Sequence, residues 1–175
     1  QCSQKNLPLT DASSRFSINR GTQAIGCNTD EISFTDSIMG EFCQSLNNDV
    51  GDFIVLRRDG LISYQLAVVV DDYHQGITEI VRGFDLLDST PRQILLQQCL
   101  DYPAANYAHI PLALNSLGQK LSKQHFAKPL TLGNESEQLW LALDWLKQNP
   151  PRELRHSSTE EILVWATAHW DLSCI

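Results

Sequence analysis

The chain has 175 residues, of which 42% are apolar and 19% are charged, a composition typical of a soluble globular protein with one ordinary domain. The formal net charge of −8 argues against non-specific nucleic-acid binding through a global positive field. The longest apolar runs, such as residues 66–70, are too short to span a membrane, and the N-terminus does not resemble a signal peptide.

The first region of the chain, residues 1–51, is polar and rich in turn-forming residues, and we expect an insertion-like β region there. Apolar and polar residues alternate within it at 15–19 and at 32–34. This alternation predicts two short strands, because successive side chains of a strand point to opposite faces.

The next predicted elements are a hairpin, a helix and a strand. Residues 52–56 are expected to form a strand, and the turn at Asp59-Gly60 predicts that the chain returns as its hairpin partner. Residues 64–73 include β-branched residues that favour a strand, whereas their apolar spacing is that of a helix. We favour the helix, and we predict a further strand at 77–81.

The clearest helix start lies at residues 89–93, which supply an N-cap, a proline at the first helical position, Pro91, and a glutamine at the third, Gln93. An apolar stripe continues this helix to Leu100. A strand is predicted next, at 107–114. A strand, a helix and a strand in succession predict a parallel crossover and therefore an α/β sheet.

We expect the α/β region to occupy residues 52–128, after which residues 129–175 have helical character. One helical stripe ends before the two prolines at 150–151, and a capping box that begins at Ser158 opens another helix. The tail is therefore expected to be two helices packed together. It also holds four tryptophans that we interpret as core residues: Trp140, Trp145, Trp165 and Trp170.

Cysteine usage indicates the compartment of the protein. The number of cysteines is odd and no CxxC pair occurs, so we expect a reducing cytoplasm and mostly structural thiols at Cys2, Cys27, Cys43, Cys99 and Cys174. The chain begins with Gln1 and has Met39 as its single methionine, which fits a fragment of a longer protein. We expect a monomer.

Basic side chains gather at two places, Arg57-Arg58 and a group made of Lys120, Lys123, His125 and Lys128. Solvated surface charge is the simplest interpretation of either group alone. The second group, however, follows a predicted strand, and ligands of α/β sheets bind at the carboxyl ends of strands. Two mobile ammonium groups there can bind a polyphosphate and stabilise a leaving pyrophosphate, while the hydroxyl of Ser122 holds the loop or a phosphate oxygen.

The lysine loop also carries a resemblance. The KLSK sequence at 120–123 resembles the KMSKS loop of class I aminoacyl-tRNA synthetases, with Leu121 in place of Met and Gln124 in place of the final Ser. Four further segments are similar, in order, to motifs of glutamyl-tRNA synthetases: residues 63–72 to YxxAxVVDD, 76–83 to GITxVIRG, 89–93 to TPRQ, and 107–112 to the strand before the lysine loop. Several motifs in register, over about residues 52–123, are far more specific than any one of them.

The resemblance implies roles for particular residues. Tyr64 and Arg82 align with residues that hold the glutamate substrate, and an arginine can bind a carboxylate through two parallel hydrogen bonds, which favours glutamate over glutamine. Lys120 and Lys123 align with the catalytic lysines that contact ATP. The implied ATP-binding loop consists of Lys120, Leu121, Ser122, Lys123 and Gln124. The alternative for Arg82 is a structural ion pair, which we favour less.

The resemblance also implies the fold: the second half of a class I synthetase nucleotide-binding, Rossmann-like catalytic domain. The HxGH signature of the first half is absent from the sequence, so we expect this chain alone not to catalyse. The short tail and the RGFDL sequence at 82–86 are more similar to the truncated glutamyl-Q tRNA(Asp) synthetase subfamily than to the full-length enzymes.

That subfamily, as the resemblance implies, activates glutamate with ATP and transfers it to queuosine in the anticodon of tRNA(Asp). The subfamily often binds zinc, and Cys2 would be the last ligand, with the other ligands upstream of this chain. Asp71 and Asp72 are either a metal pair or structural, and we favour the structural role. Two alternatives stay open: a catalytic-core fragment of a conventional glutamyl-tRNA synthetase, and a non-catalytic paralogue that acts as an interaction module.

Overall fold

The computed structural model describes residues 15–16, 31–122, 127 and 129–175. The chain forms two compact units, Gln1–His109 and Ile110–Ile175, and each is described by itself. This division differs from the boundaries expected after residues 51 and 128. Within the described ranges, no helix combines the length and the apolarity that crossing a bilayer requires.

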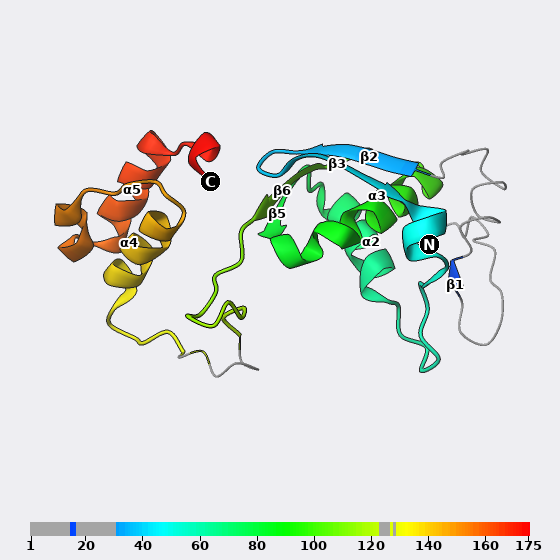
Figure 1. Cartoon of the computed structure of the whole chain (residues 1–175), viewed down its shortest axis with the longest axis horizontal. Coiled ribbons are helices and arrows are strands. Elements are labelled where there is room, and N and C mark those ends of the chain that lie inside the picture. Colours follow the sequence, from blue (N-terminus) through cyan, green and yellow to red (C-terminus); the bar gives the residue numbers. More distant parts are fainter. Residues whose placement is uncertain (1–14, 17–30, 123–126, 128) are drawn as a thin grey trace. The chain divides into compact units, whose positions relative to one another are not determined.

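The first unit is built on a sheet with the strand order β3-β2-β6-β5 (Figure 1). The strands are β2 (Glu31–Asp36), β3 (Gly40–Ser45), β5 (Glu79–Gly83) and β6 (Asn106–Ile110). β2 and β3 form an antiparallel hairpin, whereas β2 and β6 are parallel, with Asp36 opposite Tyr107. The predicted α/β class with a parallel sheet is confirmed. The β2–β3 hairpin belongs to this sheet, although its sequence predicted only a short strand at 32–34.

Two helices cover one face of this sheet, α2 (Tyr64–Gln75) and α3 (Thr90–Cys99) (Figure 1). The helix predicted at 64–73 is confirmed, and it ends at Gly76, whose φ of 70° is the left-handed conformation that favours glycine. The core between helices and sheet joins side chains from β2, α2, α3 and the segments around them: Ile32, Leu46, Val55, Val69, Leu95, Leu96 and Cys99.

The start of α3 differs from its prediction. A 3-10 helix, Phe84–Ser89, runs directly into α3, so Ser89 has helical backbone angles and its side chain makes no capping hydrogen bond. Ser89 Oγ instead accepts a hydrogen bond from Gln65 Nε2 on α2, at 3.0 Å. The predicted helix start, an N-cap followed by Pro91 as the first helical residue, is therefore wrong, because Ser89 and Thr90 already continue the helical path of the preceding turn.

The smaller β elements agree with the sequence only in part. β4 (Phe53–Ile54) is shorter than the predicted strand at 52–56, and it pairs with β1 (Arg15–Phe16). The predicted hairpin at Asp59-Gly60 is confirmed by the Arg57 amide, which donates to the Leu61 carbonyl at 2.8 Å. A π-helical turn, Leu46–Val50, links β3 to this part of the chain.

Two strand ends also shift relative to the predictions. β5 lies two residues later than the strand expected at 77–81, because the Ile77 amide still donates to the Asp72 carbonyl at the end of α2. β6 ends at Ile110 rather than continuing to residue 114, since Pro111 lacks the N–H that a strand ladder needs.

The second unit contains α4 (Glu135–Trp145) and α5 (Thr159–His169), joined through a 3-10 helix, Arg152–His156, and followed by another, Leu172–Cys174. The capping box is confirmed: the Glu161 amide donates to Ser158 Oγ and the Ser158 amide to Glu161 Oε2. The two helices pack around Leu143, Ile162 and Ala166, so the predicted two-helix tail is confirmed.

The tryptophans of this unit do not share one role. Trp165 packs against the helical core, and Trp140 Nε1 donates to the Pro151 carbonyl at 2.8 Å. Trp145 and Trp170, in contrast, are 42% and 47% exposed within the chain. Their interpretation as core residues is wrong.

Candidate functional site

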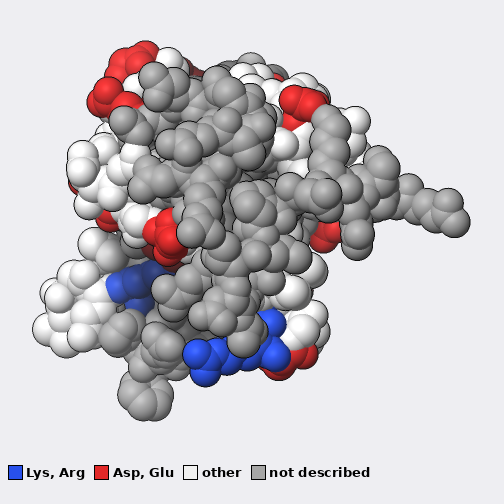
Figure 2. All heavy atoms as spheres, turned by 90° about the vertical axis from the view of Figure 1, so that its right-hand side faces the viewer, with Lys and Arg blue, Asp and Glu red and all other residues white. Residues whose placement is uncertain are grey.

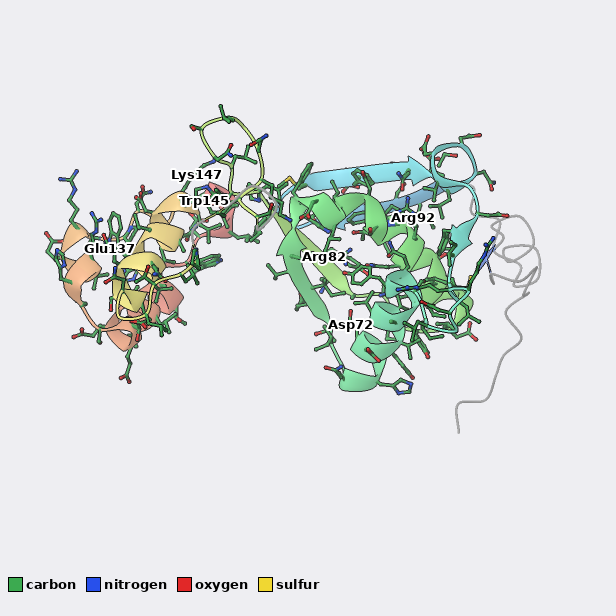
Figure 3. All side chains as sticks on the ribbon, turned by 90° about the horizontal axis from the view of Figure 1, so that it is seen from below. Asp72, Arg82, Arg92, Glu137, Trp145 and Lys147 are labelled. Atoms are coloured by element: carbon green, nitrogen blue, oxygen red, sulfur yellow. The ribbon has the colours of Figure 1, made fainter. Side chains whose placement is uncertain are left out.

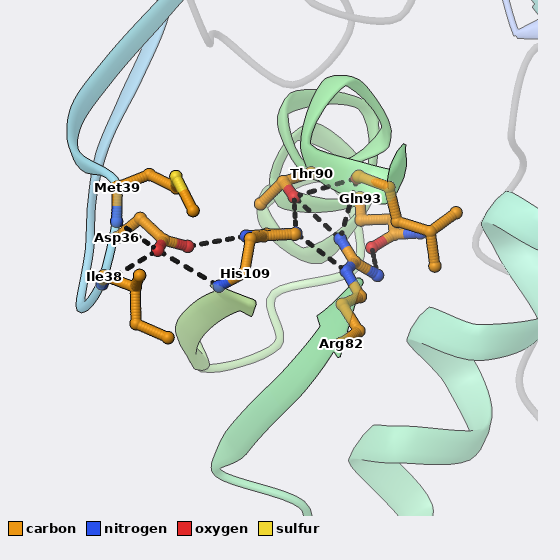
Figure 4. A network of polar contacts seen from close by, with 8 residues as sticks. Asp36, Ile38, Met39, Arg82, Thr90, Gln93 and His109 are labelled. Carbon is orange, nitrogen blue, oxygen red and sulfur yellow. Dashed lines mark hydrogen bonds and ion pairs between the residues drawn. The ribbon is translucent and has the colours of Figure 1, made fainter. Parts of the chain in front are cut away.

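Arg82, on β5, is the centre of a polar network in the first unit (Figure 4). Its Nε donates to His109 Nε2 at 3.0 Å, its Nη1 to Gln93 Oε1 at 2.7 Å, and its Nη2 to Thr90 Oγ1 at 2.7 Å. These three partners come from β6 and α3 and are almost completely buried. The crossover from β5 through α3 to β6 therefore fixes the guanidinium from two sides.

The network continues from His109 to Asp36, at the end of β2. His109 Nδ1 lies 2.5 Å from Asp36 Oδ2, and both side chains are fully shielded from solvent. Asp36 Oδ1 also accepts hydrogen bonds from three backbone amides, those of Ile38, Met39 and His109. Burial alone raises the pKa of Asp36, but the hydrogen bonds from Met39, His109 and Ile38 outweigh it and lower this pKa overall. Asp36 is therefore an ionised carboxylate.

A chain of glutamines links this network to the start of α2, where Tyr64 lies. Gln93 Nε2 donates to Gln65 Oε1 at 2.8 Å, so Gln93 connects Arg82 to the residue that follows Tyr64. Tyr64 itself is 51% exposed, so its ring is open to a ligand. The two residues expected to hold glutamate are thus connected through α2 and α3, although their joint role remains a prediction.

Asp72, labelled together with Arg82 in Figure 3, lies on α2 and interacts electrostatically with the guanidinium of Arg82. Burial raises the pKa of Asp72; the charge of Arg82 lowers it and that of Asp71 raises it, and the sum is a raised pKa. Asp71 is exposed. Among the residues that the structure describes, no group of three or more metal-binding side chains occurs, at this aspartate pair or elsewhere.

The lysine loop belongs to the second unit and begins as a narrow hairpin. Leu114 and Lys120 form an antiparallel bridge, and Asn115 Oδ1 accepts from the amides of Leu117 and Gln119 at 3.0 and 2.9 Å. The Gly118 amide also donates to the Asn115 carbonyl at 3.0 Å, so residues 115–118 form a turn before the loop. Lys120 and Leu121 are exposed. Ser122 Oγ is buried and has no hydrogen-bond partner among the described residues.

Three predicted site residues lie outside the described residues: Lys123, Gln124 and Cys2. The ATP-binding role of the loop and the zinc role of Cys2 therefore stay predictions. Figure 2 shows acidic side chains scattered over one face of the molecule and basic ones in small groups, as the net charge of −8 leads us to expect.

Sequence reasoning missed two residues of this polar network, His109 and Asp36. His109 stands inside a motif that resembled the family, so its presence was visible but its role was not. Asp36 lies 73 positions away from His109, in a region that we expected to be an insertion. The available signal was a histidine within a predicted strand, two residues before Pro111.

Comparison with known proteins assigns the family. A family model described as "tRNA synthetases class I (E and Q), catalytic domain" matches residues 12–141. A protein of Pseudomonas paraeruginosa named glutamyl-Q tRNA(Asp) synthetase is 50% identical over 83% of this chain and 50% of its own length. One of the same name from Neisseria meningitidis serogroup A is 52% identical over 81% of this chain and 47% of its own length. The chain thus spans about half the length of these relatives.

Solved structures agree with this result. A glutamate-tRNA synthetase from Elizabethkingia anophelis superposes with a TM-score of 0.59 and 25% identity, over 81% of this chain and 32% of that chain. A glutamate tRNA ligase from Elizabethkingia meningosepticum, solved in complex with its amino acid, gives a TM-score of 0.50 and 32% identity, over 57% of this chain and 20% of that chain. Because the family model covers most of the chain, the chain belongs to the class I tRNA synthetases of the E and Q group, as part of their catalytic domain.

Proposed function

We propose that this chain is part of an enzyme that activates glutamate with ATP and transfers it to queuosine in the anticodon of tRNA(Asp). The observation that carries the proposal is the identity of 50% and 52% to proteins named glutamyl-Q tRNA(Asp) synthetase. In this reaction, a glutamate carboxylate attacks the α-phosphorus of ATP and pyrophosphate leaves, which gives glutamyl-adenylate. A ring hydroxyl of queuosine then attacks the acyl carbon, an ester forms, and AMP leaves. From cysteine usage we infer a cytoplasmic enzyme, and we expect a monomer.

Arg82 and Tyr64 are proposed to bind glutamate. The guanidinium of Arg82 carries one more N–H group than its four recorded contacts use, and the contact to the Leu86 carbonyl is long, at 3.5 Å. One N–H on Nη1 and a weakly engaged one on Nη2 are therefore available to a carboxylate. No carboxylate is bonded directly to Arg82 within the described ranges, so its charge is available to an anionic substrate.

Lys120 and Lys123 are proposed to bind ATP and to stabilise the charge that develops on pyrophosphate as it leaves. Ammonium groups on long side chains suit this task, because they follow the phosphates as the bond breaks. Zinc is proposed for the whole protein, with Cys2 as one ligand. A single cysteine does not make a zinc site, and no step of the reaction is assigned to the metal.

The experiment uses the full-length gene product. Glutamate-dependent exchange of pyrophosphate into ATP is measured without tRNA, followed by glutamate transfer to tRNA(Asp) that carries queuosine and to tRNA(Glu). Exchange without tRNA and transfer to tRNA(Asp) alone are expected. Transfer to tRNA(Glu) alone would assign the chain to a conventional glutamyl-tRNA synthetase, and no exchange at all would favour a non-catalytic paralogue.

A variant of Arg82 tests the glutamate site. Arg82→Ala would leave three buried acceptors without a donor and would destabilise the fold. A loss of activity in that variant could then result from unfolding or from lost glutamate binding, so Arg82→Lys is the better change. Lysine keeps the charge but loses the planar fork, and we expect the KM for glutamate to rise on the order of 100-fold. Arg57→Lys, at an exposed ion pair with Asp59, is the matched control and should leave this KM unchanged. An unchanged KM in Arg82→Lys would refute the assignment.

A further inference from the structure

We propose that Asp36 and His109 are positioning residues for Arg82: Asp36 fixes His109 as the tautomer that accepts a hydrogen bond from Arg82 and so orients the guanidinium for the substrate carboxylate. The inference rests on the proposed function, because it concerns the same glutamate site. It adds two residues that neither touch the substrate nor belong to the lysine loop.

The tautomer of His109 follows from its partners. An arginine N–H can only donate, so His109 Nε2, which lies 3.0 Å from Arg82 Nε, must accept and cannot carry a proton. The proton of the neutral ring then sits on Nδ1, which faces Asp36 Oδ2 at 2.5 Å. Thr90 Oγ1, at 3.2 Å from the same Nε2, can donate to it or to the Leu86 carbonyl at 3.4 Å, and neither choice changes this result.

Asp36 is suited to select this tautomer. Its Oδ1 is held by three backbone amides, and its Oδ2 is left to accept from the ring of His109. An ionised carboxylate can only accept hydrogen bonds, so it requires a donor at Nδ1. The backbone amide of His109 is one of the three donors, which fixes the strand and the ring to the same carboxylate.

The fold brings the two residues together through one strand pair. Asp36 ends β2 at the position where the parallel pairing to β6 begins, opposite Tyr107, and the Ser37 amide donates to the Tyr107 carbonyl at 2.9 Å. His109 stands two residues further along β6 and therefore faces the same side of the sheet as Tyr107. The ring of Tyr107 in turn lies 5.3 Å below the guanidinium carbon of Arg82.

The arrangement orients Arg82 without a carboxylate of the described part of the chain hydrogen-bonded to it, and Asp72 interacts with the guanidinium through charge alone. Among the described residues, every hydrogen-bond partner of the guanidinium is an uncharged acceptor: the neutral ring of His109, Gln93, Thr90 and the Leu86 carbonyl. The nearest bonded carboxylate, Asp36, is separated from Arg82 by the whole imidazole ring. A carboxylate in direct contact would compete with an anionic substrate, whereas a relayed one fixes geometry and leaves the charge available.

Two substitutions of His109 separate the two halves of the relay. His109→Asn keeps a donor near the position of Nδ1 for Asp36 but has no acceptor near the position of Nε2 for Arg82. His109→Gln places a carbonyl oxygen near the position of Nε2 and has no donor near Nδ1. The inference predicts that His109→Asn raises the KM for glutamate on the order of 10- to 100-fold, and that His109→Gln retains most of the affinity.

Asp36→Asn tests the tautomer itself in the full-length protein. An amide nitrogen facing the ring disfavours a proton on Nδ1, so His109 is expected to switch to the Nε2–H form and lose its bond to Arg82. Nitrogen chemical shifts of ¹⁵N-labelled histidine should report Nδ1–H in the unchanged protein and Nε2–H in the variant. The KM for glutamate should rise with the switch while the KM for ATP stays within about twofold. Asp49→Asn, at an exposed aspartate that accepts from the Ser45 amide, is the control.

The outcomes are distinguishable. If the role of His109 is only structural, His109→Asn, which keeps the link to Asp36, is the milder change, and the KM values for glutamate and for ATP change together. That result would overturn the inference. A histidine that carries its proton on Nε2 in the unchanged protein would overturn it as well. If the unchanged protein shows no glutamate-dependent exchange, the proposed function itself fails.

Discussion

Asp36 is an acidic residue whose ionisation stabilises the folded state. Because its pKa is lowered in the folded protein, its contribution is complete above the ordinary value of 3.8. The contribution is lost progressively as the pH falls from that value through the lowered pKa. The backbone amides of Ile38 and Met39 and the ring of His109 would then face a protonated carboxyl group.

We therefore predict that Asp36→Asn flattens the acid limb of the stability curve. Urea unfolding at a series of pH values from neutral to below 4 measures it, since the folded protein should lose less stability over this range in the variant than in the unchanged chain. Glu135, an exposed residue whose pKa is lowered by the Gly133 amide, provides the control Glu135→Gln, with a smaller expected effect. Identical acid limbs for Asp36→Asn and the unchanged protein would contradict the prediction.

Helix starts show which element signals could be predicted from the sequence. The capping box at Ser158 was predictable because both partners, the serine and Glu161, lie within one helical turn, and the extended backbone of Ser157 separates them from the preceding 3-10 helix. Ser89 carried the same type of signal, but Phe84–Ser89 had already adopted a 3-10 helix. The 3-10 helix has no strong sequence signature. The N-cap pattern therefore predicted a helix start at a position where the chain is already helical.

The capping box predicts that the same substitution has unequal costs at two neighbouring serines, Ser158 and Ser157. Ser158→Ala should destabilise the second unit by about 1 kcal/mol, because it removes the bond that Ser158 Oγ accepts from the Glu161 amide and the bond that it donates to Glu161 Oε2. Ser157→Ala, next to it and with no recorded side-chain hydrogen bond among the described residues, should have little effect. Thermal unfolding followed by circular dichroism compares them. Equal changes in melting temperature for the two variants would show that the box does not stabilise α5.

In the candidate site, some residues belong to motifs that are local in the sequence, whereas others depend on partners that are far away in the sequence. Tyr64, Arg82 and Lys120 each stand in a contiguous motif, and the sequence alone identified them as candidates. The relay depends on the pairing between β2 and β6, which brings Asp36 close to His109, 73 positions away in the sequence. No local pattern of residues encodes that pairing. The sequence therefore predicted neither the role of His109 nor that Asp36 belongs to the polar network around Arg82.

At the scale of the whole molecule, two separate hydrophobic cores correspond to the two compact units. Composition suggested boundaries after residues 51 and 128, where polar and helical character change. Contacts place the division after His109 instead, because β2 joins the sheet of the first unit and the segment after β6 groups with the helices. Composition reports local propensity, whereas a unit is defined by which apolar side chains bury one another.

Separate cores predict that the two units lose stability independently in the full-length protein. Leu95→Ala removes a fully buried side chain from the first core, and Ile162→Ala one from the second, each at a cost of about 2–5 kcal/mol to its own unit. Amide hydrogen exchange should show faster exchange in α2 and α3 for the first variant and in α4 and α5 for the second. Faster exchange across all four helices in either variant would mean that the cores unfold as one cooperative unit, and the division after His109 would then have no thermodynamic meaning.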